Sequence, residues 1–218
     1  MSNQTFWSPI IISLQMISIA SIIAFVLALI CAWFMSRIAF KGKVFVETLL
    51  MLPLVLPPTV IGFGLLVLLG RQSWVGRSFE WLFSMPLVFS FWAAVIAAVV
   101  VAFPLVYQML RSGFENVNPE LEAAARQLGA NEYQVLKFIT LPLSWRSLIT
   151  GYMLGFARGL GEFGATLMFA GNIPGRTQTI PTAIFTAVES GSIILAYYWV
   201  ISIVLFSFLL LSFVQRLR

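Results

Sequence analysis

Residues 118–142 read NPELEAAARQLGANEYQVLKFITLP and form a charged stretch between two long apolar runs of the chain. Asn118 followed by Pro119 predicts the start of a helix, because asparagine caps helix ends and proline fits the first helical position. Gly129 predicts the end of this helix in a left-handed conformation, just before a second helix start at Asn131. The stretch is therefore predicted to be two short helices joined at a glycine.

Both predicted helices have an apolar side. In the first, Leu121, Ala125 and Leu128 fall on one face at positions i, i+4 and i+7, while Glu120 and Glu122 suit the positive end of the helix dipole. The apolar side of the second helix is made of Val135, Leu136, Phe138 and Ile139. Two interpretations fit this pattern: a connector that lies on the bilayer surface, or a docking unit for a groove on a cytoplasmic partner.

The composition indicates an integral membrane protein. Hydrophobic residues make up 60% of the chain and charged residues only 10%, whereas about a quarter of the residues of a soluble domain are charged. At 218 residues the chain is predicted to be a single transmembrane domain, 1–218. The first charge after the amino terminus is Arg37, which does not fit a cleavable signal peptide, so the first apolar segment is expected to be retained.

The residue types that the sequence lacks exclude several classes of site. The sequence has no His and no Asp, which removes HExxH zinc sites, Ser-His-Asp triads and aspartic dyads. The single cysteine, Cys31, lies in an apolar run and is interpreted as a structural thiol. The sequence also lacks the phosphate-binding pattern GxxxxGK[ST]. We therefore expect no catalytic site, no metal site, no cofactor in this chain and no nucleic-acid partner.

Five apolar segments are long enough to cross the hydrocarbon core, which takes about 20 helical residues. They are Pro9–Ser36, Thr48–Gly70, Met85–Leu110, Ser147–Ala170 and Ile193–Val214. A shorter segment, Thr177–Val188, contains Pro181 and is interpreted as a re-entrant or interfacial helix. Pro53, Pro57 and Pro58 interrupt the second segment, either as a packing kink or as a mobile pore-lining element. The predicted fold is an all-α polytopic bundle of about five spans, with six as the alternative.

The basic residues predict the orientation of these spans, since cytoplasmic loops carry an excess of Lys and Arg. On one side lie nine basic residues: Arg37, Lys41, Lys43, Arg111, Arg126, Lys137, Arg146, Arg216 and Arg218. The opposite side carries Arg71, Arg77 and Arg176. We therefore expect the amino terminus outside, and the carboxy terminus and residues 118–142 in the cytoplasm.

The fourth predicted span contains two charges, Arg158 and Glu162. Glycines recur every four residues in it, at Gly151, Gly155 and Gly159, a pattern that lets another helix approach closely. At about 100° per residue, the charges share the glycine face and point away from lipid. Two interpretations remain: a buried ion pair that fixes packing, or a face that lines or gates a translocation path. Gly161 and Gly164 would loosen the helix there and give it a hinge.

Five motifs resemble one family, the permeases of binding-protein-dependent ABC importers. Glu122-Ala123-Ala124, Gly129 five residues after the second alanine, and then Leu141-Pro142 resemble the EAA loop of these permeases. The segment RGLGEFGAT at 158–166 resembles the molybdate and sulfate branch of the family. So do NIPG at 172–175, TQTIP at 177–181 and LPLVLPPTVIG at 52–62. The resemblance covers nearly the whole chain, and its short length and five-span layout look more like a molybdate permease subunit than a sulfate permease.

This resemblance implies a type I ABC importer permease fold and a transport subunit rather than an enzyme. It implies that residues 118–140 are cytoplasmic coupling helices that dock on a dimer of ABC ATPases, which bind ATP and Mg²⁺. The coupling residues carried over are Glu122, Ala123, Ala124, Gly129, Leu141 and Pro142. It further implies two copies of the chain around one pore in the plasma (inner) membrane, and an extracytoplasmic oxyanion-binding protein.

Other functions stay open on the sequence alone. The transported oxyanion could be sulfate, thiosulfate or tungstate rather than molybdate. A different class is a proton-coupled secondary carrier that works without an ATPase and uses Glu162 as its proton site. A third class, an intramembrane enzyme, would need a Ser/Lys or Glu-only site, and the sequence shows no such constellation.

Overall fold

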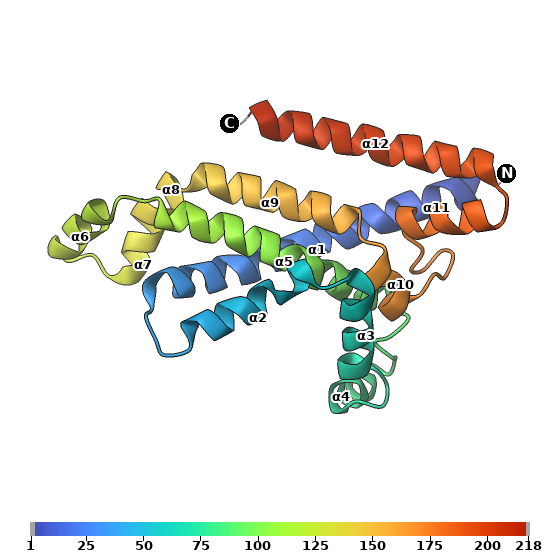
Figure 1. Ribbon diagram of the computed structural model, residues 1–218, viewed down its shortest axis with the longest axis horizontal. Helices are drawn as coiled ribbons and strands as arrows, with labels where there is room; N and C mark the ends of the chain where they lie inside the picture. The colour runs from blue at the N-terminus through green and yellow to red at the C-terminus, as the bar shows by residue number, and fades with distance from the viewer. Residues whose placement is uncertain (1–2, 217–218) are drawn as a thin grey trace.

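The computed structural model describes residues 3–216, and within them every regular element is helical (Figure 1). The elements are α1 (Asn3–Arg37), α2 (Lys43–Val55), α3 (Pro58–Leu69), α4 (Trp74–Phe83), α5 (Phe91–Glu115), α6 (Pro119–Gln127), α7 (Glu132–Val135), the π-helical η1 (Leu136–Thr140), α8 (Leu141–Leu143), α9 (Trp145–Leu160), α10 (Gly164–Ala170), α11 (Ile180–Glu189) and α12 (Ile193–Arg216). This confirms the prediction of an all-α fold.

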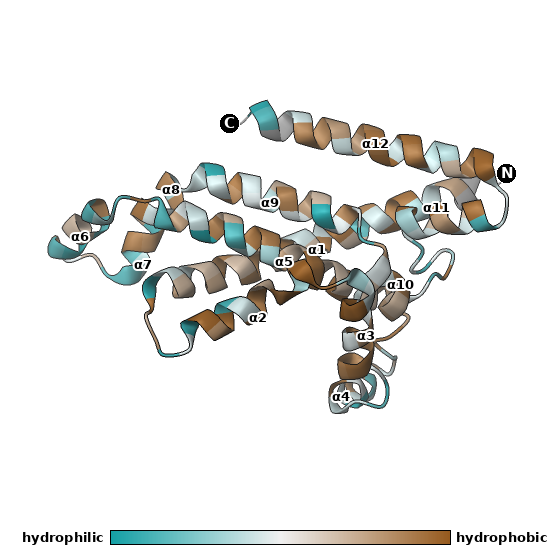
Figure 2. Cartoon of the chain, viewed as in Figure 1, coloured by the Kyte–Doolittle hydropathy of each residue, from teal (hydrophilic) through white to brown (hydrophobic). Residues whose placement is uncertain are grey.

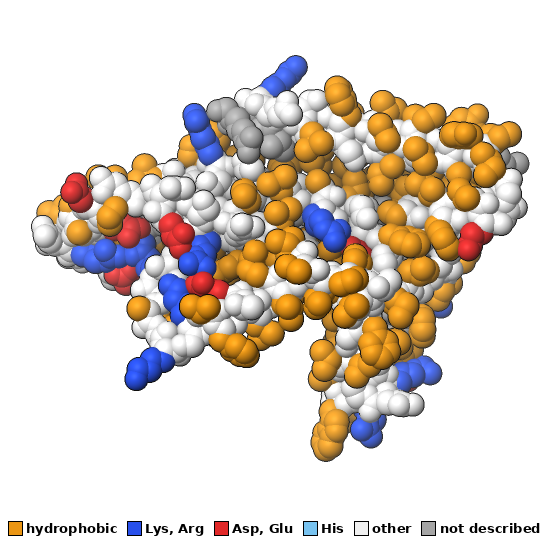
Figure 3. All heavy atoms as spheres, in the orientation of Figure 1, with side chains coloured by type: hydrophobic (Ala, Val, Ile, Leu, Met, Phe, Trp, Pro, Cys, Tyr) orange, Lys and Arg blue, Asp and Glu red, His pale blue; other side chains and the backbone are white. Residues whose placement is uncertain are grey.

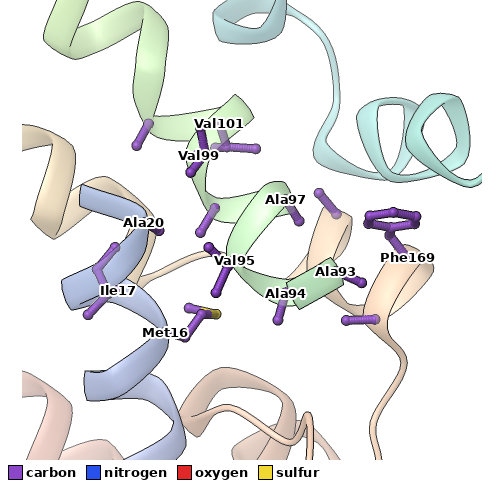
Figure 4. Packing of buried hydrophobic residues seen from close by; sticks show 14 of the residues in the cluster. Met16, Ile17, Ala20, Ala93, Ala94, Val95, Ala97, Val99, Val101 and Phe169 are labelled. Atoms are coloured by element: carbon purple, nitrogen blue, oxygen red, sulfur yellow. The ribbon is translucent and has the colours of Figure 1, made fainter. Parts of the chain in front are cut away.

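Small residues allow α1, α5 and α9 to pack closely at the centre of the bundle. Alanines recur every four residues along α1, at Ala20, Ala24, Ala28 and Ala32, and all are fully buried. Residues four apart lie on one helix face, so this stripe presents a smooth surface to α5. Figure 4 shows Met16, Ile17 and Ala20 of α1 beside Val95 of α5. Small residues at such contacts favour association of helices in a membrane, because they let backbones approach.

The predicted second span is two helices, α2 and α3, which meet at an angle of 116°. Leu56 and Pro57 join them in an extended conformation, with ψ angles of 142° and 137°. The cause is local, because each of these residues precedes a proline, and a residue before proline is disfavoured in the helical region. Pro58 then begins α3, which leaves the direction of the bundle (Figure 1). The kink predicted from the prolines is therefore a complete break of the helix.

The predicted fourth span is also divided, into α9 and α10, with Gly161, Glu162 and Phe163 between them. Its second half, α10, packs closely against α3, the second half of the other broken segment. If Gly62 of α3 carried a Cβ, that atom would lie only 2.9 Å from the Cα of Ala165 in α10. Gly164 makes a similarly close approach to Pro58. The distal halves, α3 and α10, thus form one packed pair beside the central bundle.

Within residues 3–216, three helices are by themselves long and apolar enough to span a membrane: Phe6–Arg37, Phe91–Glu115 and Ile193–Ser212. The bent pair α2–α3 is a fourth candidate if it counts as one span. These four candidates correspond to four of the five predicted spans. The fifth predicted span is the segment divided into α9 and α10, and α9 alone, with 16 residues, is too short to cross the membrane. The predicted short segment is α11, an apolar helix of 10 residues.

Apolar side chains cover much of the face of the bundle seen in Figures 2 and 3, and charged side chains gather most densely at one end of it. Apolar side chains of α12 such as Ile194, Phe208 and Leu209 are exposed. Basic and acidic side chains gather over α6 and α7, at the left of Figure 3. This distribution fits a multi-pass membrane protein whose charged end projects out of the bilayer.

Candidate functional site

The candidate site begins with the segment that we call the 118–140 loop, which links α5 to α8 and α9 and contains α6, α7 and η1. The Asn118 side chain caps α6 as predicted, because its Oδ1 accepts a hydrogen bond of 2.9 Å from the backbone N–H of Glu120. Gly129 has a φ of +90°, so the predicted left-handed end of the first helix is confirmed. Non-glycine residues rarely adopt this conformation, which explains the glycine.

The second half of the loop also starts as predicted, at Asn131. Its side chain accepts a hydrogen bond from the backbone N–H of Gln134, and the Gln134 side chain accepts one from the backbone N–H of Asn131. This reciprocal arrangement is a capping box and fixes the start of α7. Beyond Val135 the helix widens into η1, a π-helical turn that the sequence did not predict. Such turns occur mostly as single insertions within α-helices.

Four charged side chains and a threonine tie the loop together and connect it to α1. Arg37, the last residue of α1, donates to Glu122, to Glu132 over 3.3 Å and to the Thr140 hydroxyl over 3.0 Å. Arg126 donates from Nε to Glu132 over 2.6 Å and lies 3.5 Å from Glu122. Thr140 in turn donates to Glu122 over 2.6 Å. The glutamate of the EAA pattern is therefore engaged within the chain, and its side chain is 14% exposed.

The pKa values follow from this network. The hydrogen bond from Arg126 lowers the pKa of Glu132, and the positive charges of Arg126 and Arg37 act in the same direction. The same hydrogen bond raises the pKa of Arg126. Glu132 and Arg126 are thus expected to remain ionised in the physiological range, and the contact between them to persist there.

The loop presents apolar side chains on its outside. Leu121, Leu128 and Phe138 are 48%, 90% and 66% exposed, and Tyr133 is exposed beside them. Leu128 and Phe138 also line a groove of about 300 Å³ that Gly129 and Ile139 border. The predicted apolar faces are therefore present, with one difference: Val135 is fully buried and belongs to the inside of the loop.

The remaining residues of the EAA-like pattern differ from Glu122 in that most of them are exposed at the surface. Ala123 and Ala124 are exposed on α6, where their small side chains leave the backbone accessible. Leu141 is half-buried and Pro142 is exposed in α8, directly before α9 enters the bundle. The structure thus separates Glu122, which faces inward, from Ala123 and Ala124, which face outward.

A second charged feature lies at the break between α9 and α10. The guanidinium of Arg158 lies 3.1 Å from one carboxylate oxygen of Glu162, and the other oxygen accepts a hydrogen bond of 2.8 Å from the backbone N–H of Ala165. Glu162 is 1% exposed, whereas the Arg158 side chain is 33% exposed. Glu162 therefore accepts a hydrogen bond from the first turn of α10 and pairs with Arg158 in the last turn of α9, so the predicted ion pair is present.

The glycines of α9 lie against the central helices. A Cβ on Gly151 would lie 2.6 Å from Leu110 of α5, and one on Gly155 would clash with Val106. Gly159 makes the same kind of approach to Ile17 of α1. The close helix packing predicted from these glycines is thus present, but Arg158 lies at the margin of the buried face and Glu162 lies beyond the end of α9.

Sequence reasoning did not assign a partner to Arg37 or a role to Thr140. Arg37 and Glu122 lie 85 positions apart, so no local pattern links them. A second ion-pair cluster was also missed, in which Arg111 of α5 contacts Glu47 of α2 over 2.8 Å and Glu115 over 2.7 Å. The only signal for Arg37 was its place as the first charge after a long apolar run.

Comparison with known proteins agrees with this architecture. Residues 24–218 match the family described as "Binding-protein-dependent transport system inner membrane component". A putative molybdenum transport system permease protein of Bacillus subtilis (strain 168) is 50% identical over 99% of this chain and 95% of its own length. The molybdenum transport system permease protein of Escherichia coli (strain K12) is 44% identical over 84% of this chain and 80% of its own.

The fold also matches solved structures. A bacterial ABC transporter that imports the acidic polysaccharide alginate superposes with a TM-score of 0.78 at 15% identity, over 99% of this chain and 79% of that one. This likeness supports the fold, which is that of an ABC importer permease. The family match over residues 24–218 establishes that the chain belongs to the inner-membrane components of binding-protein-dependent transport systems.

Proposed function

We propose that this chain is the membrane-spanning permease subunit of an ABC importer that carries molybdate across the plasma membrane. The observation that carries the proposal is the 118–140 loop, which holds two capped helices in fixed positions and exposes Leu121, Leu128 and Phe138 beyond the bundle. Similarity to molybdenum permeases over nearly the whole chain supports molybdate as the substrate.

The loop is proposed to dock on a dimer of cytoplasmic ABC ATPases, which bind and hydrolyse ATP with Mg²⁺. Exposed apolar side chains on short, rigid helices suit insertion into a groove on a partner protein. Two copies of the chain would enclose one pore, and an extracytoplasmic protein would deliver the oxyanion. When the ATPases close and open, the loops would carry their movement to α5 and α9, to which they are joined directly.

The orientation that this mechanism requires is supported by the charges. The end of the bundle that carries the 118–140 loop also carries Arg37, Lys41, Lys43, Arg111, Arg146 and Arg216. Arg218, the ninth residue of the predicted basic set, lies outside the described residues. We therefore place this end in the cytoplasm and the amino terminus outside.

The break that contains Arg158 and Glu162 is proposed to line or gate the translocation path. A cation that faces lipid at the bilayer centre costs about 2.5–3.5 kcal/mol on insertion scales, and the Arg158 side chain is one-third exposed in the single chain. A water-filled path between two copies would remove this cost. Gly161 and Gly164 flank the break, where they would let α10 and its partner α3 turn relative to α9.

Replacement of Glu162 by Gln tests this assignment. Gln keeps an acceptor for the N–H of Ala165 but leaves Arg158 without its counter-charge, so we expect a loss of stability of about 1–3 kcal/mol and a loss of transport. The double variant Arg158→Gln/Glu162→Gln removes the unpaired charge and should recover thermal stability. If the double variant also recovers transport, the pair serves packing alone and does not line the path.

The experiment that tests the function is uptake into vesicles that contain the permease, the ATPase and the binding protein. We expect ATP-dependent accumulation of molybdate, and competition by tungstate or sulfate measures the specificity. Uptake driven by a proton gradient in vesicles without the ATPase would instead indicate a secondary carrier that uses Glu162. Accumulation of sulfate in preference to molybdate would contradict the substrate assignment.

A further inference from the structure

Arg37 links the 118–140 loop to α1, a helix that the chain does not join to the loop directly. The chain joins the loop to α5 at one end and to α8 and α9 at the other, whereas α1 precedes it by 80 residues or more. The main packing contacts of α6 are with α7 and η1, inside the loop itself. Arg37 stands at the end of α1 and contacts both α6 and α7 through Glu122 and Glu132.

The space beside the contact between Arg37 and the loop is not filled by packed side chains. A cavity of about 660 Å³ lies between the ends of α1 and α5 and the loop, and its lining includes Trp33, Phe114, Pro119 and Glu122. Because this space is open, the side chains of α1 do not form a continuous apolar contact with α6. The polar contacts of Arg37 therefore bridge the two sides of this cavity, from the end of α1 to α6 and α7.

The geometry of Arg37 suits this task. Its two terminal nitrogens divide between partners: Nη2 donates to Glu122 and to the Thr140 hydroxyl, and Nη1 donates to Glu132. The side chains of Arg37 and Glu122 are 18% and 14% exposed, which limits competition from water. A planar guanidinium can hold several acceptors in fixed directions, whereas the ammonium group of lysine acts as a point charge.

Arg126 shows that Arg37 is not needed merely to close the loop. Arg126 lies within the loop and contacts the same two carboxylates, Glu132 over 2.6 Å and Glu122 over 3.5 Å. The two arginines balance the two glutamates. Arg126 therefore holds α6 against α7, and the contribution specific to Arg37 is the connection to α1.

We propose that Arg37 is a positioning residue that fastens the 118–140 loop to α1, so that movement of the loop reaches α1 as well as α5 and α9. α1 packs along both of these helices, and the three would then move together when an ATPase displaces the loop. This step rests on the proposed function, in which the loop docks on the ATPase. Without Arg37, the loop would tilt about its two covalent joints, and less of its movement would reach α1 and the bundle.

The test compares Arg37→Gln and Arg37→Lys with the control Arg111→Gln. Arg111 is a matched control because it is also a half-buried arginine at the same end of the bundle and binds two glutamates, but its partners Glu47 and Glu115 lie outside the loop. Hydrogen exchange of amides 120–135 is measured in the complete transporter without ATP. We expect Arg37→Gln to raise exchange about tenfold, equivalent to about 1.4 kcal/mol, with a smaller rise for Arg37→Lys and none for Arg111→Gln.

The same variants are then assayed in vesicles for ATP hydrolysed per molybdate ion imported. Arg37→Gln should retain the ATPase during purification but hydrolyse several times more ATP per ion, whereas Arg111→Gln should keep the wild-type ratio. The proposal is overturned if Arg37→Gln leaves exchange or the ratio unchanged, or if both glutamine variants change them equally. If Arg37→Gln does not fold, the proposal is tested with Arg37→Lys, by its hydrogen exchange and by the ATP that it hydrolyses per molybdate ion. Failure of the wild-type chain to bind an ATPase would contradict the proposed function, while the same exchange measurement on the permease alone would still test the attachment to α1.

Discussion

Glu122 stands first in the EAA-like pattern, yet its carboxylate faces into the molecule. It accepts hydrogen bonds from Arg37 and Thr140 and lies near Arg126, so its charge is used to hold the loop in shape. The exposed members of the pattern, Ala123 and Ala124, have side chains too small to add much contact of their own. At the scale of residues, the pattern therefore combines a polar inner side with a flat outer side that a partner can approach.

Gly129 offers a direct test of this shape. Its φ is +90° and a Cβ there would meet nothing within 4 Å, so a substitution acts through the backbone alone. A β-branched residue in this conformation costs about 1–2 kcal/mol, and we expect Gly129→Val to disturb the end of α6 and reduce ATPase-coupled transport while membrane insertion stays normal. Transport and co-purification of the ATPase measure the effect.

The control for this substitution is Gly175→Val. Gly175 also has a positive φ, +76°, with no neighbour within 4 Å, but it lies between α10 and α11, far along the chain from the loop. It should impose similar backbone strain without loss of coupling. Gly129→Asn should be milder than Gly129→Val, since asparagine tolerates the left-handed region. Normal transport and ATPase binding by Gly129→Val would contradict the docking role of the loop.

At the scale of elements, the two breaks have different physical causes. The α2–α3 break follows from consecutive prolines, which force Leu56 and Pro57 into extended conformations. The α9–α10 break contains a buried glutamate that hydrogen-bonds the first turn of the next helix. Because α3 and α10 pack on each other, the two breaks together define one pair of helices whose direction differs from that of the bundle.

The packing of α9 on α5 can be tested at Gly155. A Cβ there would clash with Val106, so Gly155→Ala should lower stability by about 1–3 kcal/mol through overpacking. Adding Val106→Ala should restore part of this loss, because it removes the atom that clashes. Thermal unfolding of the purified protein in detergent measures both variants.

The matched control for Gly155→Ala is Gly64→Ala in α3, where a Cβ would meet nothing within 4 Å. This substitution should be neutral or slightly stabilising, because alanine favours helix more than glycine does. Equal thermal stability of Gly155→Ala and wild type, or no recovery in the double variant, would show that α9 can shift away from α5 at little cost.

At the scale of the whole molecule, charge is concentrated where the helices end and apolar surface covers their length (Figures 2 and 3). The long helices and the broken ones share a common end at the 118–140 loop, where Arg37 and Arg111 fasten α1 and α2 to their neighbours. The attachment through Arg37 suits this end to receive force, because it connects the 118–140 loop to α1 as well as to the helices that the chain joins to the loop.

Orientation can be measured with single cysteines. Replacement of Cys31, the only cysteine, by serine gives a background in which Gln127→Cys and Ser190→Cys are labelled separately. Both positions are exposed and lie at opposite ends of the bundle. We expect a membrane-impermeant maleimide to label Ser190→Cys in intact spheroplasts, and Gln127→Cys only in inverted vesicles. The reverse pattern would contradict a cytoplasmic 118–140 loop.

The sequence by itself determined those features that depend on neighbouring residues. Helix starts at Asn118 and Asn131, the left-handed Gly129 and the close approach of α9 at its glycines could all be predicted, because caps, φ angles and residue size act locally. Only the tertiary structure decided which charges meet. Arg37 reaches Glu122 across 85 positions, and Glu162 became a link between two helices because α9 ends before it. Such contacts depend on how the apolar helices pack, and a one-dimensional pattern of charges does not contain that information.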